Sequence, residues 1–310
     1  MIGLEQTLDD YLALRRSLGH KLADAERQLR RFVAYLEVVG AEIVTLDIAL
    51  GFVLDPALDP ASSVPARRLE AVRGFARHLT GIEPRTEIPP AGLVSYRGRR
   101  RRPYLFDEDE IRLLMATAAA AAARTPLRGL TLETLIGLLA VTGLRVGEAL
   151  RLDRADIDFD DAVLTVRATK FGKSRQVPVA ATTIDALTTY AQLRDQTRPR
   201  VRASTFFVSQ SGTPVIYNNF CHTFRRVVDT AGVGAGSPGR PSIHGLRHSF
   251  AVRTLVGWHR DGLDVAVLLP RLSTYLGHRE PRYTYRYLTA TPELLGYAAR
   301  LLEAHQAAGT

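Results

Sequence analysis

The sequence contains very little cysteine. Cys221 is the single cysteine among 310 residues, so neither an intramolecular disulfide nor a zinc site built from several cysteines can form. A chain without disulfides is typical of a reducing compartment. We therefore expect a cytoplasmic protein.

Long apolar runs are missing as well. No segment approaches the ~20 apolar residues of a membrane helix, and the Ala-rich segment 116–123 is too short. Residues 1–19 form a polar, amphipathic stretch without the apolar core of a signal peptide. These absences favour a globular protein that works outside the membrane.

Acidic residues are outnumbered by basic ones. There are 41 Lys and Arg against 32 Asp and Glu, which gives a formal net charge of +9 and a pI near 10.0. An apolar content of 46% and a charged content of 24% are ordinary for one large or two medium globular domains. The excess favours a polyanionic partner, because each Lys or Arg near a phosphate releases counterions. Charge alone is equally consistent with a basic protein that has no such partner.

The first 95 residues show helical spacing of apolar side chains. Amphipathic helices are expected over about residues 4–18 and 22–36, a short helix after Thr45, and a fourth helix over residues 63–79. This pattern predicts a small all-α domain over residues 1–95. We expect its polar faces to carry the arginines Arg15, Arg16, Arg27, Arg30, Arg31, Arg67, Arg68, Arg73 and Arg77.

A proline-containing basic linker follows over residues 96–103. It contains five arginines within six positions, namely Arg97, Arg99, Arg100, Arg101 and Arg102. A solvated hinge is one interpretation of such a charge run. Arginines that lie along a phosphate backbone are the interpretation that we favour.

The remaining chain, residues 104–310, is predominantly helical by pattern. The acids of residues 107–110 fall in the first turn of a periodic helix, where carboxylates meet free N–H groups, so we interpret them as a helix start and not as a Mg²⁺ site. Residues 162–180 alternate in polarity around a turn, which predicts a β-hairpin or meander. Further helices are expected at about 130–141, 182–194, 216–231, 244–257, 264–276 and 292–304. The predicted fold class is α+β, predominantly α, with a small antiparallel sheet.

A first candidate motif is TGLRVGE, residues 142–148. A glycine after an apolar helix allows the backbone to turn sharply and enter a new helix. Such a turn places Arg145 at a rigid helix terminus, and Glu148, one turn further on, is positioned to orient its guanidinium.

A second motif, residues 170–178, reads KFGKSRQVP. A lysine at a hairpin tip, Lys170, can bring an ammonium proton donor into a cleft. The FGKS string is not a nucleotide-binding loop, because that motif requires a glycine where Arg167 stands and a strand-to-helix transition.

A third motif is HGLRHSF, residues 244–250. His244 and Arg247 are three residues apart and therefore share one helical face. His244 and His248 have the spacing of a zinc helix, but Gly245 stands where the metalloprotease motif requires glutamate. No third ligand is nearby, so we expect no metal.

A fourth motif combines LGH at residues 276–278 with a tyrosine nine residues further on, Tyr287. Tyrosines in helices are usually core or interface residues. Tyr283 and Tyr285 also compete for any chemical role, and Tyr283 is expected on the same helical face as Tyr287.

Taken together, these residue types are suited to phosphodiester chemistry. Attack on a phosphodiester builds negative charge on the non-bridging oxygens, and paired guanidiniums bind such oxygens through parallel hydrogen bonds. A tyrosine hydroxyl has an ordinary pKa near 10, so it needs a proton acceptor, and the departing oxygen needs a donor. A covalent phosphotyrosine conserves the bond energy without ATP or a metal.

The order of the motifs resembles that of the tyrosine recombinases, the phage integrase family. The matching strings are TGLRxxE, KxGKxRxVP, HxLRHSFA, and LGH with its later tyrosine, over about residues 104–305. The resemblance implies a helical core-binding (SAM-like) domain over 1–95, a basic linker over 96–103 and an integrase-type catalytic domain over 104–310. It implies a site-specific recombinase that cuts and rejoins double-stranded DNA through a 3′-phosphotyrosine, in integration, excision, resolution or transposition, without a cofactor.

The resemblance also implies residue roles. The predicted catalytic residues are Arg145, Lys170, His244, Arg247, His278 and Tyr287, with Glu148 supporting the first arginine. The two arginines clamp the scissile phosphate, Lys170 protonates the leaving 5′ oxygen, and His244 is the general base or its assistant. His278 hydrogen-bonds a non-bridging oxygen and Tyr287 is the nucleophile. The expected DNA-binding residues are Arg97, Arg99, Arg100, Arg101, Arg102, Lys173 and Arg175.

The chain departs from the family pattern between Arg247 and His278, which are further apart than the family spacing by one or two helical turns. We expect the surplus in a loop at residues 257–262. Residues 292–304 predict an amphipathic C-terminal helix, which in the family docks on a neighbouring protomer of a cyclic tetramer around two duplexes. Accessory recombination proteins are further expected partners.

Three other functions are weighed against recombination. A non-catalytic DNA-binding protein explains the charge but not the ordered set of Arg, Lys, His and Tyr. A relaxing topoisomerase of similar chemistry would act without a specific site. A metal-dependent transposase would be inhibited by EDTA, whereas the tyrosine mechanism would survive chelation.

Overall fold

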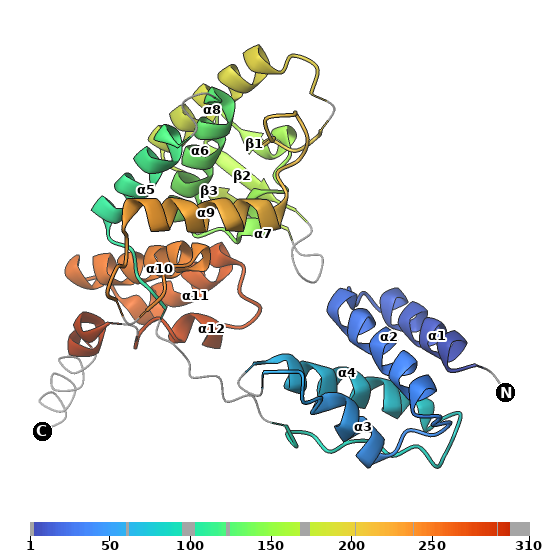
Figure 1. Ribbon diagram of the computed structural model, residues 1–310. Coiled ribbons are helices and arrows are strands. Elements are labelled where there is room, and N and C mark those ends of the chain that lie inside the picture. The colour runs from blue at the N-terminus through green and yellow to red at the C-terminus, as the bar shows by residue number, and fades with distance from the viewer. Residues whose placement is uncertain are drawn as a thin grey trace, which may run out of the picture. The chain divides into compact units, whose positions relative to one another are not determined.

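The computed structural model describes residues 3–59, 62–94, 103–121, 125–167, 174–201, 203–237, 239–289 and 291–297. The chain divides into two compact units, Met1–Arg100 and Arg101–Thr310 (Figure 1). Each unit has its own hydrophobic core, and each is described separately below.

The first unit is a helical bundle. Its helices are α1 (Leu4–Ser17), α2 (Ala23–Val38), α3 (Leu46–Val53) and α4 (Val64–Leu79). The helix expected after Thr45 begins there because the Thr45 hydroxyl accepts a hydrogen bond of 3.3 Å from the amide of Ile48. Phe32 and Phe75 are fully buried at the centre of the bundle. The DNA-binding role assigned to this unit from the sequence stays a prediction.

Arg68 departs from the expected polar face of this unit. Its side chain is buried, donates a hydrogen bond of 2.7 Å to the carbonyl of Phe52, and stacks 4.4 Å from the centroid of the Phe52 ring. A planar guanidinium can pack on an aromatic face while its edge binds a carbonyl, so the arginine belongs to the core.

The second unit contains the sheet and the remaining helices. The helices are α5 (Glu108–Ala120), α6 (Pro126–Thr142), α7 (Val146–Ala149), the 3₁₀ helix η1 (Arg154–Asp156), α8 (Ala181–Thr197), α9 (Tyr217–Ala231), α10 (Ile243–Arg260), α11 (Val265–Leu276) and α12 (Arg282–Tyr285). Residues 292–297 are also helical. The acids expected at a helix start begin α5, where Asp107 and Glu110 form a capping box.

The strands form a small antiparallel sheet in the order β1-β2-β3, with β1 (Ile157–Asp158), β2 (Val163–Val166) and β3 (Arg175–Pro178). Leu164 lies opposite both Ile157 and Val177, and all three side chains are buried. One face of the sheet therefore packs against the core. The small antiparallel sheet among many helices confirms the predicted α+β class with a helical majority.

Two apolar clusters make up the core of the second unit. The larger surrounds α6, which packs against α5, α8 and α10. The smaller joins α10 and α11 and includes Tyr287 and Leu294. α10 contributes to both clusters, because Leu246 belongs to the first and Leu255 to the second.

The prediction of a loop at residues 257–262 is wrong. α10 continues through Gly257 and ends at Arg260, and the turn that follows it contains Gly262, which has a φ of +69°. The amide of Leu263 donates to the Trp258 carbonyl at 2.9 Å, as in a glycine-terminated helix end. A glycine inside a helix weakens it by only about 1 kcal/mol, so packing of the neighbouring residues keeps the segment helical.

Candidate active site

Arg145 lies at the junction between α6 and α7. α6 ends at Gly143, whose φ of +60° favours glycine, and a Cβ there would lie 2.6 Å from Cδ1 of Phe250. The Arg145 guanidinium donates 2.7 Å to Oε1 of Glu148 through Nη1 and 3.0 Å to the carbonyl of Gly277 through Nη2. Its side chain keeps 38% of its surface exposed, so part of the guanidinium faces solvent.

Arg247 lies on α10 and is almost completely buried. Its Nη1 donates to the Gly143 carbonyl at 2.6 Å, and its Nη2 donates to the Leu276 carbonyl at 2.7 Å. Burial, followed by the charge of Arg145, lowers the pKa of Arg247 to about 10. The group therefore stays cationic at neutral pH.

Glu148 is the buried anion between two guanidiniums. Its Oε1 accepts from Arg145, and Arg175 of β3 donates to Oε2 at 2.8 Å and to Oε1 at 3.4 Å. Burial alone raises the pKa of Glu148, but hydrogen bonds and charge from Arg175 and Arg145 outweigh it and hold the pKa below its ordinary value. The carboxylate is thus ionised at neutral pH.

The C-terminal end of α11 binds three arginines in succession. The carbonyls of Tyr275, Leu276 and Gly277 accept hydrogen bonds from Arg175, Arg247 and Arg145, at 2.7, 2.7 and 3.0 Å. The last carbonyls of a helix are free of intrahelical partners and carry its negative dipole end. That end of α11 therefore concentrates positive charge beside His278.

Tyr287 lies among histidine rings. It is buried, with 6% of its surface exposed, while Tyr283 and Tyr285 are 38% and 53% exposed. Its ring stacks on His278 at 6.1 Å between centroids and meets the edge of His248 at 5.4 Å. Of the three tyrosines, only Tyr287 is enclosed.

The expectation that Tyr287 lies within a helix is wrong. α12 ends at Tyr285, and the Tyr287 amide donates to the Thr284 carbonyl at 3.0 Å in the following turn. A one-turn helix that follows Pro281 makes few backbone bonds, so the buried Tyr287 and Thr284 side chains fix its end.

His244, His248 and His278 are held in their neutral forms. Partial desolvation, with the charges of nearby arginines, lowers the pKa of His244 below its ordinary value, although part of this residue is exposed to solvent. Burial, with the same charges, lowers the pKa of His278 to about 3. Burial, then the neighbouring His244, lowers the pKa of His248 to about 4. Nδ1 of His278 lies 2.7 Å from Oγ1 of Thr284, a contact that fixes its ring. All three imidazoles are therefore uncharged at neutral pH.

His248 is the site residue that sequence reasoning missed. Its ring meets His244 at 4.7 Å and Tyr287 at 5.4 Å, and its Nδ1 is buried without a hydrogen-bond partner in the described part of the chain. Its i, i+4 spacing from His244 was considered only as a metal-binding pattern. The same spacing, which puts both rings on one helical face, was the available signal.

The structure brings together Arg145, Glu148, His244, Arg247, His278 and Tyr287 from the predicted set. Lys170 and Lys173, and the linker arginines of residues 97–102, lie outside the described residues. Arg175 lies inside the cluster, with its side chain 11% exposed, so the expected surface contact with DNA does not fit its position.

Over the described ranges, no three His, Cys, Asp or Glu side chains gather as metal ligands. Among the same residues, no helix combines the length and apolarity that spanning a membrane requires.

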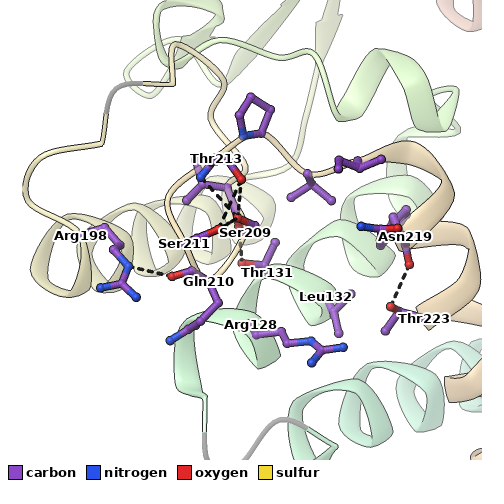
Figure 2. A pocket seen from close by; sticks show the side chains of 15 residues that line it. Arg128, Thr131, Leu132, Arg198, Ser209, Gln210, Ser211, Thr213, Asn219 and Thr223 are labelled. Carbon is purple, nitrogen blue, oxygen red and sulfur yellow. Dashed lines mark hydrogen bonds between the residues drawn. The ribbon is translucent and has the colours of Figure 1, made fainter.

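A pocket of about 550 Å³ opens elsewhere in the second unit. It lies between the start of α6, the segment 208–216 and the start of α9, and Figure 2 shows Thr131 next to the hydroxyl cluster of Ser209 and Thr213, with Arg128 further away. None of its lining residues belongs to the cluster around Tyr287.

The chain is similar to several recombinases. The model of the family described as "Phage integrase family" matches residues 105–293. A Sinorhizobium fredii (strain NBRC 101917 / NGR234) protein, y4rB, whose name describes it as an integrase/recombinase, is 42% identical over 98% of both chains. Tyrosine recombinase XerD of Caulobacter vibrioides (strain ATCC 19089 / CIP 103742 / CB 15) is 30% identical over 94% of this chain and 85% of its own.

A solved structure shares the fold. The Tn1549 transposon integrase, in complex with transposon right end DNA, superposes with a TM-score of 0.67 and 17% identity over 96% of this chain and 98% of that chain. The chain therefore belongs to the phage integrase family, and it is a tyrosine-type site-specific recombinase that acts on DNA.

Proposed function

We propose that the chain cuts and rejoins DNA strands through a covalent 3′-phosphotyrosine on Tyr287. The observation that carries this proposal is the enclosure of Tyr287 by His248 and His278, next to a buried cationic Arg247. Tyr287 lies close enough to Arg247 to raise the pKa of the guanidinium, against the larger lowering by burial. A nucleophile for phosphate needs an enclosed position beside fixed positive charge and a neutral imidazole nearby.

In the proposed step, the Tyr287 hydroxyl oxygen attacks the phosphorus of one phosphodiester. The bond from phosphorus to the tyrosine oxygen forms while the bond from phosphorus to the 5′ oxygen breaks. The tyrosine proton passes to His244, which is neutral and can accept it, and Lys170 protonates the departing 5′ oxygen. Rejoining reverses these transfers with a different 5′ hydroxyl, so the number of phosphodiester bonds is unchanged.

Arg145 and Arg247 are proposed to bind the non-bridging oxygens. Both guanidiniums are already oriented by backbone carbonyls, and that of Arg145 is partly exposed to solvent. His278 is proposed to donate a hydrogen bond to the same phosphate from Nε2, because its Nδ1 faces Thr284. Positive groups fixed before the reaction stabilise the charge that develops in the transition state.

Replacement of Tyr287 by phenylalanine tests the nucleophile. Incubated in EDTA with nicked duplexes from the DNA that flanks its own gene, the wild type should give a covalent protein–DNA band. Tyr287→Phe should bind the same DNA and give none, because only the hydroxyl is lost. Tyr283→Phe and Tyr285→Phe are the matched controls and should keep the band. A band of undiminished intensity from Tyr287→Phe would exclude the assignment.

We further propose that protomers act as a tetramer on two duplexes. A similar fold occurs in a lambda integrase tetramer bound to a Holliday junction, with a TM-score of 0.62 and 18% identity. Light scattering of the protein bound to a synthetic four-way junction should give the mass of four chains. A mass of one or two chains at saturation would contradict it.

A further inference from the structure

We propose that Arg175 is a positioning residue of the reaction: it holds the Glu148 carboxylate, and through it the Arg145 guanidinium, and does not itself bind DNA. The inference rests on the function proposed above. It concerns a side chain that the sequence pattern assigns to the DNA-contacting surface.

All three nitrogens of the Arg175 guanidinium donate a hydrogen bond inside the protein. Nε donates to the carbonyl of Tyr275 at 2.7 Å, and Nη2 and Nη1 face the two oxygens of Glu148 at 2.8 and 3.4 Å. The side chain is 11% exposed and its partner carboxylate 3% exposed. A guanidinium held by a carbonyl on one edge and a carboxylate on another has little left for a phosphate.

The two hydrogen bonds from Arg175 also orient the Glu148 carboxylate. A forked contact fixes the plane of a carboxylate as well as its position. In that plane Oε1 faces Nη1 of Arg145 at 2.7 Å, and Oε2 faces the Arg145 backbone amide at 3.1 Å. Arg145 is therefore oriented by a carboxylate whose own orientation depends on Arg175.

Arg175 also lies close to the turn that precedes His278. A Cβ on Gly277 would lie 2.6 Å from Nη1 of Arg175, and Gly277 has a φ of +66°. The guanidinium thus packs directly on the backbone that carries His278. One side chain joins β3, α7 and the end of α11, three elements that each hold part of the site.

The test uses four variants of the full chain. Arg175→Gln and Glu148→Gln remove either partner, the double variant removes both, and Arg175→Lys keeps the charge without the fork. Arg253→Gln is the control, because Arg253 on α10 also donates to a backbone carbonyl, that of Ala140 at 2.9 Å, with no bond to Glu148. Each is measured for affinity to nicked duplex, for the salt dependence of binding and for the rate of covalent adduct formation at saturating DNA.

Arg175→Gln should form adduct about 100-fold more slowly, the loss expected when a reacting group is displaced by ~1 Å. Its affinity and the salt slope of binding should match the wild type. Arg175→Lys should restore only part of the rate, since an ammonium lacks the planar fork. The double variant should be no slower than the slower single variant, because both substitutions break one connection.

Other outcomes would overturn the proposal. A weaker affinity with a salt slope reduced by about 1 at an unchanged saturated rate would assign Arg175 to a phosphate contact. Equal loss of rate in Arg175→Gln and Arg253→Gln, in proportion to lost stability, would make the role purely structural. If the wild type forms no adduct, the proposed function fails. The connection between Arg175 and Glu148 would then be tested separately: additive effects of Arg175→Gln and Glu148→Gln on the unfolding free energy would exclude it.

Discussion

Replacement of His248 by glutamine should change how the stability of the second unit depends on pH. Burial, then His244 and the cations Arg247 and Arg286, lower the pKa of His248 to about 4 in the folded chain. In the unfolded chain the ring returns to about 6.5. The proton therefore binds the unfolded state more tightly, and stability present above pH ~6.5 is lost as the pH falls towards about 4.

The size of this effect follows from the two pKa values. The difference between 6.5 and about 4 corresponds to a loss of about 3 kcal/mol over the whole range, because one pKa unit is worth ~1.4 kcal/mol. Near pH ~5.5 the unfolded ring is mostly protonated and the folded ring is not. One histidine then contributes a slope of about 1.2 kcal/mol per pH unit to the unfolding free energy.

Urea unfolding followed by Trp258 fluorescence measures this slope. Trp258 is the single tryptophan of the chain and lies on α10, the helix that carries His248. His248→Gln should lower the slope between pH ~6.5 and ~4.5 by about 1 kcal/mol per pH unit. His222→Gln, which removes an exposed histidine on α9, is the control and should keep the wild-type slope. Identical slopes in all three proteins would refute a buried, neutral His248.

Two further predictions concern the same site. Gly277→Ala should destabilise the chain by about 1–2 kcal/mol, because φ is +66° and a Cβ would strike Arg175. The same substitution should slow adduct formation. Gly257→Ala should stabilise the chain by about 0.5–1 kcal/mol, because its Cβ would meet nothing within 4 Å. Urea midpoints of the two variants check this pair, and equal midpoints would contradict it. The adduct rate should be independent of pH near neutrality and fall only well below pH ~6.5. The reason is that desolvation and the charges of Arg247 and Arg145 lower the pKa of the proposed base His244. A rate that falls between pH ~8 and ~7 would contradict a neutral base.

Much of the fold was accessible from local signals. Thr45 and Asp107 begin helices because a side-chain oxygen before an apolar run caps free amides. Gly143 ends α6 because the chain there requires a left-handed conformation. These signals involve only a few neighbouring residues, so a single sequence carries them. The continuation of α10 through Gly257 depends on packing against α11 and was not accessible in this way.

The site was predicted less completely than the fold. Motif order identified the residues that gather around Tyr287, since spacing along a helix fixes which side chains share a face. The position of Arg175 depends on its contact with Tyr275, 100 residues away in the chain, and no local pattern reports such a contact. The enclosure of His248 depends in the same way on the turn after α12.

Two of the three arginines at the end of α11 also bear on the entropy of the proposed phosphate binding. A free arginine side chain has about 2 kcal/mol of rotamer entropy to lose when it is fixed on a ligand. Arg145 and Arg247, which are proposed to bind the phosphate, lose much of that freedom when the chain folds, because the carbonyls of Gly277 and Leu276 hold them. This entropy is lost on folding, so a phosphate that binds later would meet guanidiniums that are already arranged. Loosening the end of α11 should thus weaken the site without removing any of its charges.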